Sequence, residues 1–351
     1  MNEVIICRNL EGDLTAALSR VNYDRLFVLT DEHTISFCWP IISDWKCMQG
    51  AQLITIGATD EHKTLETLAS VWTSLQQGGA TRHSLLVNLG GGMVTDLGGF
   101  AASTFKRGFP YINIPTTLLS MVDASVGGKT GINFGGLKNE IGVFSKPDSV
   151  LLDTRFLATL DHPNLLSGYA EMLKHGLISD EEQWARLMRF SLEDINYDEL
   201  QQMVADSVAV KERIVTEDPT ERGIRKALNL GHTVGHAFES LALAESRPVL
   251  HGYAVAWGLV CELYLSCRLT GFPKERLQQT LQFIREHYGT FLFDCKKYDT
   301  LYTLMTHDKK NQAGRINFTL LAAIGDIRIN QTATKEEIVD SLDFFRDSMG
   351  G

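Results

Sequence analysis

The first half of the chain alternates short apolar runs with stretches of helical periodicity. Six runs rich in β-branched residues lie at 4–7, 26–30, 52–56, 85–89, 111–114 and 150–153. Residues 63–77 repeat apolar side chains at helical spacing and end at Gly78-Gly79, which is typical of a C-terminal helix cap. Strands that alternate with helices favour a parallel sheet flanked by helices. We therefore predict a Rossmann-like α/β domain with a mostly parallel sheet over residues 1–160.

From about residue 161 the pattern changes to long amphipathic segments. They cover 165–178, 182–190, 200–215, 224–243, 253–269, 274–287 and 335–348, and their apolar residues recur at helical spacing. Two short runs around Gly325 predict a hairpin, and Thr334 with Glu337 predicts a capping box. We expect a mostly α-helical C-terminal domain over residues 161–351, with a cleft between the two domains.

Composition narrows the possible partners. The chain has 351 residues, of which 44% are hydrophobic and 22% charged, and its formal net charge is -10. This acidic balance argues against a nucleic-acid or anionic-membrane partner, since both need an excess of lysine and arginine. No secretion signal is evident, and the longest apolar stretch, 253–261, is too short to cross a bilayer. We expect a cytoplasmic protein that binds neither nucleic acid nor membrane.

The six cysteines are scattered and include no Cys-x-x-Cys pair. This spacing favours neither a thiolate zinc site nor a disulfide framework. We expect buried, reduced thiols.

The clearest chemical signal lies between residues 225 and 251. Arg225, Asn229, His232 and His236 are three or four positions apart, so a single helix would bring them to one face. His251 follows one loop later. Imidazoles at this spacing are preferred ligands of zinc-like ions. An arginine and an amide beside them are costly to bury without partners, which favours a combined metal and anion site.

A carboxylate from elsewhere in the chain would complete such a site, and Glu171 is our candidate. The ordinary alternative is that two histidines one helical turn apart are core or surface residues. The run His-Thr-Val-Gly-His lacks the glutamate of the metalloprotease signature.

Two glycine-rich segments in the first half indicate anion binding. Gly90-Gly91-Gly92 follows the run 85–89 and precedes a helical stretch from Met93, where backbone amides can accept a pyrophosphate. Thr95 stands where the dinucleotide fingerprint needs glycine, so a plain tight turn is the alternative.

The second segment, 123–130, resembles a nucleotide-triphosphate loop, but Asp123 occupies the place of its first glycine. We interpret it as a loop that presents Lys129 and, further on, Lys138 and Asn139 to an anionic ligand. Solvated surface lysines are the alternative.

Six blocks together resemble the 3-dehydroquinate synthase family, of the shikimate pathway. They are GGGMVTDLGGF (90–100), PTTLL (115–119), VDASVGGKTGIN (122–133), KNEIG (138–142), AEMLKHG (170–176) and NLGHTVGHA (229–237). Their order and spacing cover most of the chain, which makes the resemblance far more specific than any one motif.

The resemblance implies NAD in the N-terminal α/β domain, a divalent metal, zinc or cobalt, and a small phosphorylated sugar acid as substrate. It also implies a homodimer. The implied metal ligands are Glu171, His232 and His251, a choice that spacing alone leaves open. The implied catalytic residues are Lys129, Lys174, Lys211, Arg225, Asn229 and His236. The implied substrate-binding residues are Arg107, Asp123, Lys138, Asn139 and Lys310. The implied NAD-binding residues are Asp31, Asp60, Lys63, Gly91, Gly92, Asp96, Thr116, Thr117, Lys138, Thr159 and Leu160.

The implied reaction converts 3-deoxy-D-arabino-heptulosonate 7-phosphate to 3-dehydroquinate and phosphate. A ring hydroxyl is oxidised by NAD, phosphate is eliminated, the hydride is returned, and the opened ring closes on itself as a carbocycle. A phosphate and a carboxylate on one substrate require several cations, which explains converging lysines and arginines in an acidic protein.

Two regions depart from the family pattern. Tyr253 stands where the family usually has glutamate, so a carboxylate beside His251 is lost. Asp60 and His33 stand where glutamate and asparagine are common, which affects the expected NAD contacts.

Three other readings stay open. Valiolone- or inosose-type sugar phosphate cyclases share the oxidation and elimination. A metal-dependent polyol or glycerol dehydrogenase shares the two-domain plan but releases NADH. A metal- or nucleotide-binding module without catalysis is the third.

Overall fold

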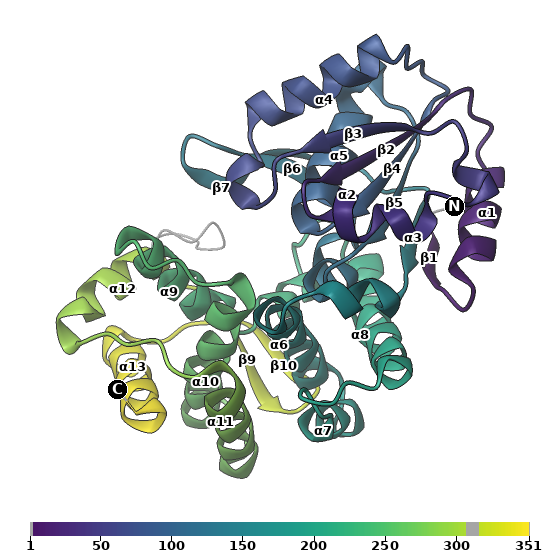
Figure 1. Cartoon of the computed structure of the whole chain (residues 1–351). Coiled ribbons are helices and arrows are strands. Elements are labelled where there is room, and N and C mark those ends of the chain that lie inside the picture. The colour runs from purple at the N-terminus through teal and green to yellow at the C-terminus, as the bar shows by residue number, and fades with distance from the viewer. Residues whose placement is uncertain (1–2, 307–315, 351) are drawn as a thin grey trace. The chain divides into compact units, whose positions relative to one another are not determined.

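The computed structural model describes residues 3–306 and 316–350 (Figure 1). The chain forms two compact units. The first, the sheet unit, comprises Met1–Asp161 with Asn196–Val208, and the second, the helical unit, comprises His162–Ile195 with Ala209–Gly351. Helix α8 (Tyr197–Glu217) contributes to both. The assignment of NAD to residues 1–160, and of metal and substrate to residues 161–351, stays a prediction.

The sheet unit contains a six-stranded sheet in the order β1-β8-β5-β4-β2-β3. All neighbouring strands are parallel. The strands are β1 (Glu3–Ile6), β2 (Leu26–Asp31), β3 (Gln52–Ile56), β4 (Leu85–Gly90), β5 (Tyr111–Pro115) and β8 (Ser149–Leu152). All six predicted strands are present, each within one residue of its expected bounds, and the α/β prediction is confirmed.

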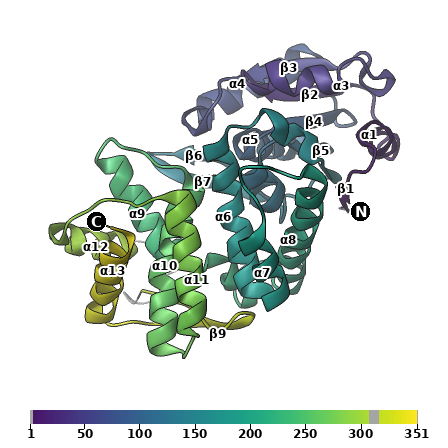
Figure 2. The ribbon, with the colours of Figure 1, turned by 60° about the horizontal axis from the view of Figure 1, so that its bottom comes forward.

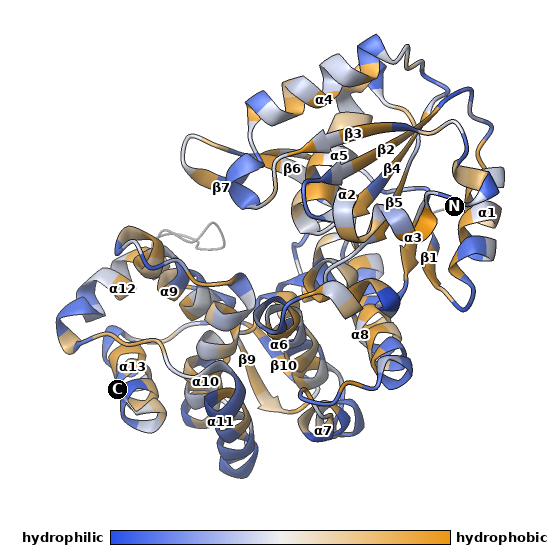
Figure 3. Cartoon of the chain, in the orientation of Figure 1, coloured by the Kyte–Doolittle hydropathy of each residue, from blue (hydrophilic) through white to orange (hydrophobic). Residues whose placement is uncertain are grey.

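Helices cover this sheet. They are α1 (Leu10–Ser19), α2 (Thr34–Phe37), α3 (Trp39–Ile42), α4 (Leu65–Gln77) and α5 (Gly92–Thr104). The short 3-10 helices of this unit are η1 (Lys46–Met48), η2 (Asp60–His62), η3 (Phe105–Arg107) and η5 (Thr154–Thr159), and η4 (Ser120–Ala124) is a π-helix. Phe27 and Leu29 of β2 pack with Leu68 of α4 and Leu97 of α5, while Val28 between them is equally buried. The four central strands, β2, β4, β5 and β8, are buried on both faces, which explains their largely apolar sequences (Figure 3).

An antiparallel hairpin of β6 (Lys129–Phe134) and β7 (Leu137–Phe144) lies in the same unit. We predicted a loop that presents Lys129, Lys138 and Asn139. This prediction is wrong, because the three residues lie on paired strands. The two strands approach so closely at the pair Gly131 and Gly142 that neither position has room for a Cβ. These glycines interrupt the β-strand pattern in the sequence.

The helical unit confirms the mostly α-helical prediction. Its elements are α6 (His162–Ser179), α7 (Glu181–Arg189), η6 (Ile224–Asn229), α9 (His232–Ala244), α10 (His251–Leu269), α11 (Lys274–Tyr288), η7 (Cys295–Lys297), α12 (Tyr298–Thr306) and α13 (Lys335–Met349), with the hairpin β9 (Phe318–Ala323) and β10 (Asp326–Gln331). Helix α10 packs against α6, α9, α11 and α13 (Figure 2). The predicted capping box of Thr334 and Glu337 is present.

The predicted single helix over 224–243 is wrong. The 3-10 helix η6 ends at Asn229, Gly231 adopts the left-handed backbone conformation with φ of 80°, and α9 begins at His232. Arg225 and Asn229 therefore lie on a different element from the histidines.

The prediction of buried thiols is only partly right. All six cysteines are free, and Cys7, Cys38 and Cys261 are buried, but Cys295 is exposed and the other two are half-buried. In the described part of the chain, no helix is long and apolar enough to cross a membrane.

Candidate metal and substrate site

Three helix segments of the helical unit bring one carboxylate and two imidazoles together. Glu171 lies in the middle of α6, while His232 and His251 are the first residues of α9 and α10. Glu171 Oε1 lies 3.4 Å from His232 Nε2 and 3.5 Å from His251 Nε2. Two ligands of a tetrahedral zinc ion, each about 2.0–2.1 Å from the metal, are separated by roughly 3.4 Å. The two distances from Glu171 Oε1 therefore match two edges of a tetrahedral zinc site.

Glu171 Oε1 is buried and makes no hydrogen bond to any residue that the structure describes. A buried carboxylate oxygen without such a bond is costly. A cation held between the three side chains removes this cost, so the donor set fits zinc or cobalt.

Both imidazoles expose the correct nitrogen for metal binding. His232 Nδ1 lies 3.1 Å from the carbonyl oxygen of Leu230, and His251 Nδ1 lies 3.2 Å from Glu239 Oε2. A carbonyl or an ionised carboxylate can only accept, so each Nδ1 carries the proton. In the neutral ring Nε2 then has the free lone pair that a metal needs.

Lys174 forms an ion pair with Glu171 Oε2 from one helical turn away. Both side chains are almost fully buried. Burial alone would raise the pKa of the Glu171 carboxyl, but Lys174 and His232 hold that pKa well below its usual range. Glu171 is consequently ionised at neutral pH, as a metal ligand must be.

The two histidines have opposite pKa shifts. Burial lowers the pKa of His232 to about 4, despite the neighbouring Glu171. Burial also disfavours the charged form of His251, but the neighbouring carboxylates of Glu171 and Glu239 outweigh it and raise that pKa to about 10. At neutral pH, His251 without metal therefore carries a second proton, on Nε2. A cation that binds this nitrogen must displace that proton.

His236 lies beside this group, with its ring centroid 5.3 Å from that of His232 and 5.8 Å from that of His251. Donor nitrogens of the three imidazoles lie within 4.8 Å of one another. Geometry alone would therefore permit His236 as a ligand. We favour Glu171, because its Oε1 is close to both other nitrogens and lacks a hydrogen bond among the described residues.

Arg225 and Asn229 lie on η6, which a preceding turn organises. Asp218 accepts hydrogen bonds from the backbone nitrogens of Gly223 at 2.6 Å and Arg225 at 3.1 Å. The Arg225 guanidinium is buried and donates to the carbonyl of Pro219 at 2.8 Å. Asn229 Nδ2 donates to Glu221 Oε1 at 2.9 Å. The turn thus fixes a buried cation and an amide on one short element.

Lys211, on α8, is also buried in the helical unit. Lys310 lies outside the described residues.

Sequence reasoning missed Glu221, Glu239 and Glu262. Glu239 follows His232 by seven residues on α9, so helical spacing from the histidine was an available signal. Glu221 lies in a turn with φ of 59°. Glu262 contacts the start of α9 from α10. No spacing rule indicates either of these two.

In the sheet unit, the expected phosphate-binding turn lies where β4 ends and α5 begins. Gly91 is the N-cap of α5, and the helix starts at Gly92. A Cβ at Gly91 would lie 3.1 Å from Thr117, and a Cβ at Gly92 would lie 3.1 Å from Ala124. The turn therefore has little room for a side chain at either position. A helix N-terminus at the carboxyl end of a parallel strand is suited to a pyrophosphate.

Lys63, Asp96 and Asn139 meet in the same unit. The buried Lys63 Nζ lies 2.5 Å from Asp96 Oδ2 and 2.5 Å from Asn139 Oδ1. The backbone nitrogen of Asn133 also donates to the carbonyl of Lys63 at 2.8 Å. These contacts join the segment after β3 to the β6–β7 hairpin.

The other expected NAD-binding residues lie at strand ends and turns. Asp31 ends β2, and its Oδ1 accepts from the backbone nitrogens of His33 and Thr34. Asp60 forms a 3.8 Å ion pair with Lys138. Thr116 and Thr117 follow β5, whereas Thr159 and Leu160 lie at the end of η5.

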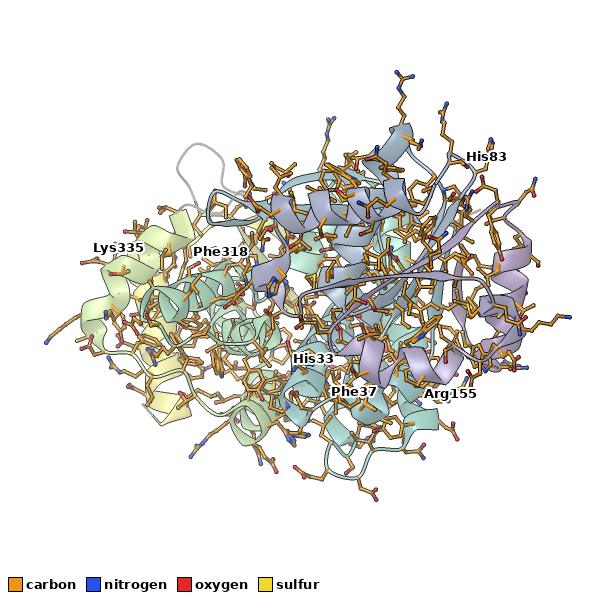
Figure 4. All side chains as sticks on the ribbon, turned by 45° about the horizontal axis from the view of Figure 1, so that its top comes forward. His33, Phe37, His83, Arg155, Phe318 and Lys335 are labelled. Carbon is orange, nitrogen blue, oxygen red and sulfur yellow. The ribbon has the colours of Figure 1, made fainter. Side chains whose placement is uncertain are left out.

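The remaining expected substrate residues of this unit are spread over three elements. Asp123 lies in η4, the exposed Lys129 begins β6, and the exposed Arg107 ends η3 with φ of 71°. His33, which departs from the family pattern, is exposed at the N-cap of α2, and Phe37 is the last residue of that helix (Figure 4). Tyr253 packs edge-on against Trp257 and Tyr288, with ring centroids 5.9 and 5.2 Å apart.

Comparison with known proteins identifies the family. The 3-dehydroquinate synthase N-terminal model matches residues 53–167, and the 3-dehydroquinate synthase C-terminal model matches residues 168–311. The chain belongs to the 3-dehydroquinate synthase family. It is 58% identical to a 3-dehydroquinate synthase of Parabacteroides distasonis over 99% of both chains. It is 35% identical to one of Clostridium tetani, over 91% of this chain and 85% of that one. The predicted family is confirmed.

Solved structures agree with the fold of a 3-dehydroquinate synthase. A 2-epi-5-epi-valiolone synthase from Streptomyces hygroscopicus subsp. jinggangensis, solved with NAD+ and Zn2+, superimposes with a TM-score of 0.84, 25% identity and coverage of 99% of this chain and 97% of that one. A 2-deoxy-scyllo-inosose synthase, solved with carbaglucose-6-phosphate, NAD+ and Co2+, gives a TM-score of 0.83 at 22% identity, over 99% and 96%.

Proposed function

We propose that this chain is a 3-dehydroquinate synthase that converts 3-deoxy-D-arabino-heptulosonate 7-phosphate to 3-dehydroquinate and phosphate, and thus a phosphate-eliminating lyase. The observation that carries the proposal is the convergence of Glu171 Oε1 with the Nε2 atoms of His232 and His251, in a chain of this family. The match to the Parabacteroides distasonis enzyme over nearly the full length of both chains supports it.

We propose NAD and zinc or cobalt as the cofactors. NAD, when bound, would supply a hydride acceptor for the carbon that bears a substrate hydroxyl, and a divalent ion would supply Lewis-acid polarisation of that hydroxyl oxygen. Glu171, His232 and His251 would hold the ion. The turn at Gly91 and Gly92, together with the other expected residues of the sheet unit, would bind NAD.

The substrate's phosphate and carboxylate require cations, and buried or clustered lysines and arginines supply them. Lys174, Lys211 and Arg225 are buried in the helical unit, where a charge that meets an anion is least screened. Asn229 would orient a substrate hydroxyl without adding charge. His236 would move a proton near the reacting carbon, since imidazole titrates near neutrality. Arg107, Asp123, Lys129, Lys138, Asn139 and Lys310 would complete substrate binding.

The decisive test measures phosphate release and NADH absorbance together. The purified protein, supplied with NAD and Zn2+, should release phosphate from the heptulosonate phosphate without accumulating NADH. Release from sedoheptulose 7-phosphate alone would indicate a valiolone-type cyclase. Accumulation of NADH with turnover would instead indicate a polyol dehydrogenase.

Substitution of a proposed ligand tests the metal site. His251→Ala should lower turnover by at least about 100-fold, because several kcal/mol of charge stabilisation are lost. The matched control is His83→Ala, which removes an exposed histidine of the sheet unit (Figure 4).

We also propose that the enzyme is a cytoplasmic homodimer, which its family membership supports. Light scattering of the purified protein would measure the oligomeric state, and a monomer at assay concentration would contradict the proposed dimer.

A further inference from the structure

We propose that Glu239 is a positioning residue that holds His251 in its metal-binding form. The inference rests on the proposed function, because it assumes that His251 binds the metal. It concerns only residues of the helical unit.

The contact between the two side chains is direct. Glu239 Oε2 lies 3.2 Å from His251 Nδ1, and their side chains are 14% and 28% exposed. Glu239 lies on α9, two helical turns after His232, whereas His251 begins α10. The carboxylate therefore reaches across from the helix that begins with one proposed ligand to the helix that begins with the other.

The chemistry of imidazole gives this contact a role. A ring that binds metal through Nε2 must carry its proton on Nδ1, and an acceptor at Nδ1 fixes both this tautomer and the ring's rotation. His232 receives such an acceptor from the backbone carbonyl of Leu230. His251 receives it from the side chain of Glu239. Of these two acceptors, only the Glu239 carboxylate can be removed by substitution of a side chain.

The two acceptors also differ in charge. A carbonyl is neutral, whereas a carboxylate is anionic and makes the imidazole opposite it a stronger electron donor to a cation. We infer that His251 is the more strongly donating imidazole of the pair. Neutralisation of Glu239 should therefore weaken metal binding even where the hydrogen bond is kept.

The experiment measures zinc affinity by competition with a chromophoric chelator, on the full-length chain. Glu239→Ala should weaken Zn2+ binding about 10- to 100-fold, the usual effect of losing a partner of a ligating histidine. Glu239→Gln, whose amide oxygen still accepts from Nδ1, should give a smaller loss. Glu286→Gln, at an exposed position of the same unit, is the matched control and should bind as the wild type does.

The Co2+-loaded proteins provide a spectroscopic readout. The visible absorption of bound Co2+ reports ligand geometry, so Glu239→Ala should alter it and Glu239→Gln should largely retain it. Wild-type affinity and an unchanged Co2+ spectrum in Glu239→Ala would overturn the inference. If that variant does not fold, wild-type affinity in folded Glu239→Gln would overturn it. A wild-type protein that binds no Zn2+ would instead refute the proposed metal site itself.

Discussion

The carboxylate of Glu262 lies 2.6 Å from the backbone nitrogen of Gly231, between helices α10 and α9. Its second oxygen accepts from the backbone nitrogen of Val234 at 3.1 Å, and the side chain is fully buried. The first N–H groups of a helix have no partner within the helix, and the helix dipole favours an anion beside them. Glu262 thus fixes the turn that carries His232.

Replacement of Glu262 should destabilise the protein. Each buried N–H group left without a partner costs about 1–3 kcal/mol. We expect Glu262→Ala to lower the free energy of unfolding by about 3 kcal/mol, and Glu262→Gln by less. Urea unfolding of the metal-free protein measures both values, with the exposed Glu286→Ala as control. A change below about 1 kcal/mol in Glu262→Ala would contradict the capping role.

Gly252 controls how closely α6 and α10 approach. A Cβ at this position would lie 1.9 Å from the carbonyl oxygen of Ser167, and the Gly252 nitrogen donates to Ser167 Oγ at 3.1 Å. Gly252→Ala must separate the helices that carry Glu171 and His251. We expect a loss of about 1–3 kcal/mol in unfolding free energy, together with weaker Zn2+ binding.

Ser167→Ala is the control for this substitution. It removes the hydrogen bond without creating a clash, so it separates the two effects. Equal zinc affinity in Gly252→Ala and the wild type would show that helix spacing does not affect the site.

The sequence predicts the central strands β2, β4, β5 and β8 well because they are buried on both faces. Val28 and Leu29 point to opposite faces of the sheet and are both fully buried. Strand β2 is therefore a continuous apolar run, which is typical of a buried parallel strand. The β6–β7 hairpin was missed for the opposite reason. Its β7 strand is exposed along its length, and paired glycines interrupt the pattern.

The proposed metal site shows where sequence reasoning ends. Spacing indicates His232, His236 and His251 as one group, and the structure brings their donor nitrogens within 4.8 Å of one another. Spacing does not select a carboxylate some sixty residues earlier. Glu171 was a candidate from the sequence, and only the family resemblance implied it as a ligand in place of His236. The break at Gly231 was missed because Glu262, on another helix, stabilises it. Such contacts depend on tertiary packing, which local periodicity does not encode.

Cysteine reactivity should separate the buried thiols from the exposed one. Burial raises the pKa of Cys7 to about 12 and that of Cys38 to about 11. Since the thiolate is the reactive form, at pH 8 only about one Cys38 thiol in a thousand is ionised, and labelling should accelerate as pH rises toward 11. Mass spectrometry after brief maleimide treatment at pH 8 should find Cys295 labelled first. Early labelling of Cys38 would contradict the burial of this thiol.

Lys63 should couple NAD binding to the β6–β7 hairpin. Its buried ammonium lies 2.5 Å from both Asp96 Oδ2 and Asn139 Oδ1. Lys63→Met keeps the length of the side chain but removes the cation between them. We expect NAD+ affinity to fall about 10-fold or more, because charge-assisted bonds of this kind contribute about 1.5–3 kcal/mol.

Titration calorimetry of NAD+ binding measures this loss, and urea unfolding should show a parallel loss of about 3 kcal/mol, since one partner of a buried ion pair is removed. Lys46→Met, at an exposed position of the same unit, is the matched control and should change neither quantity. If folded Lys63→Met binds NAD+ as tightly as the wild type, Lys63 holds the hairpin for structural reasons alone and is not part of the cofactor site.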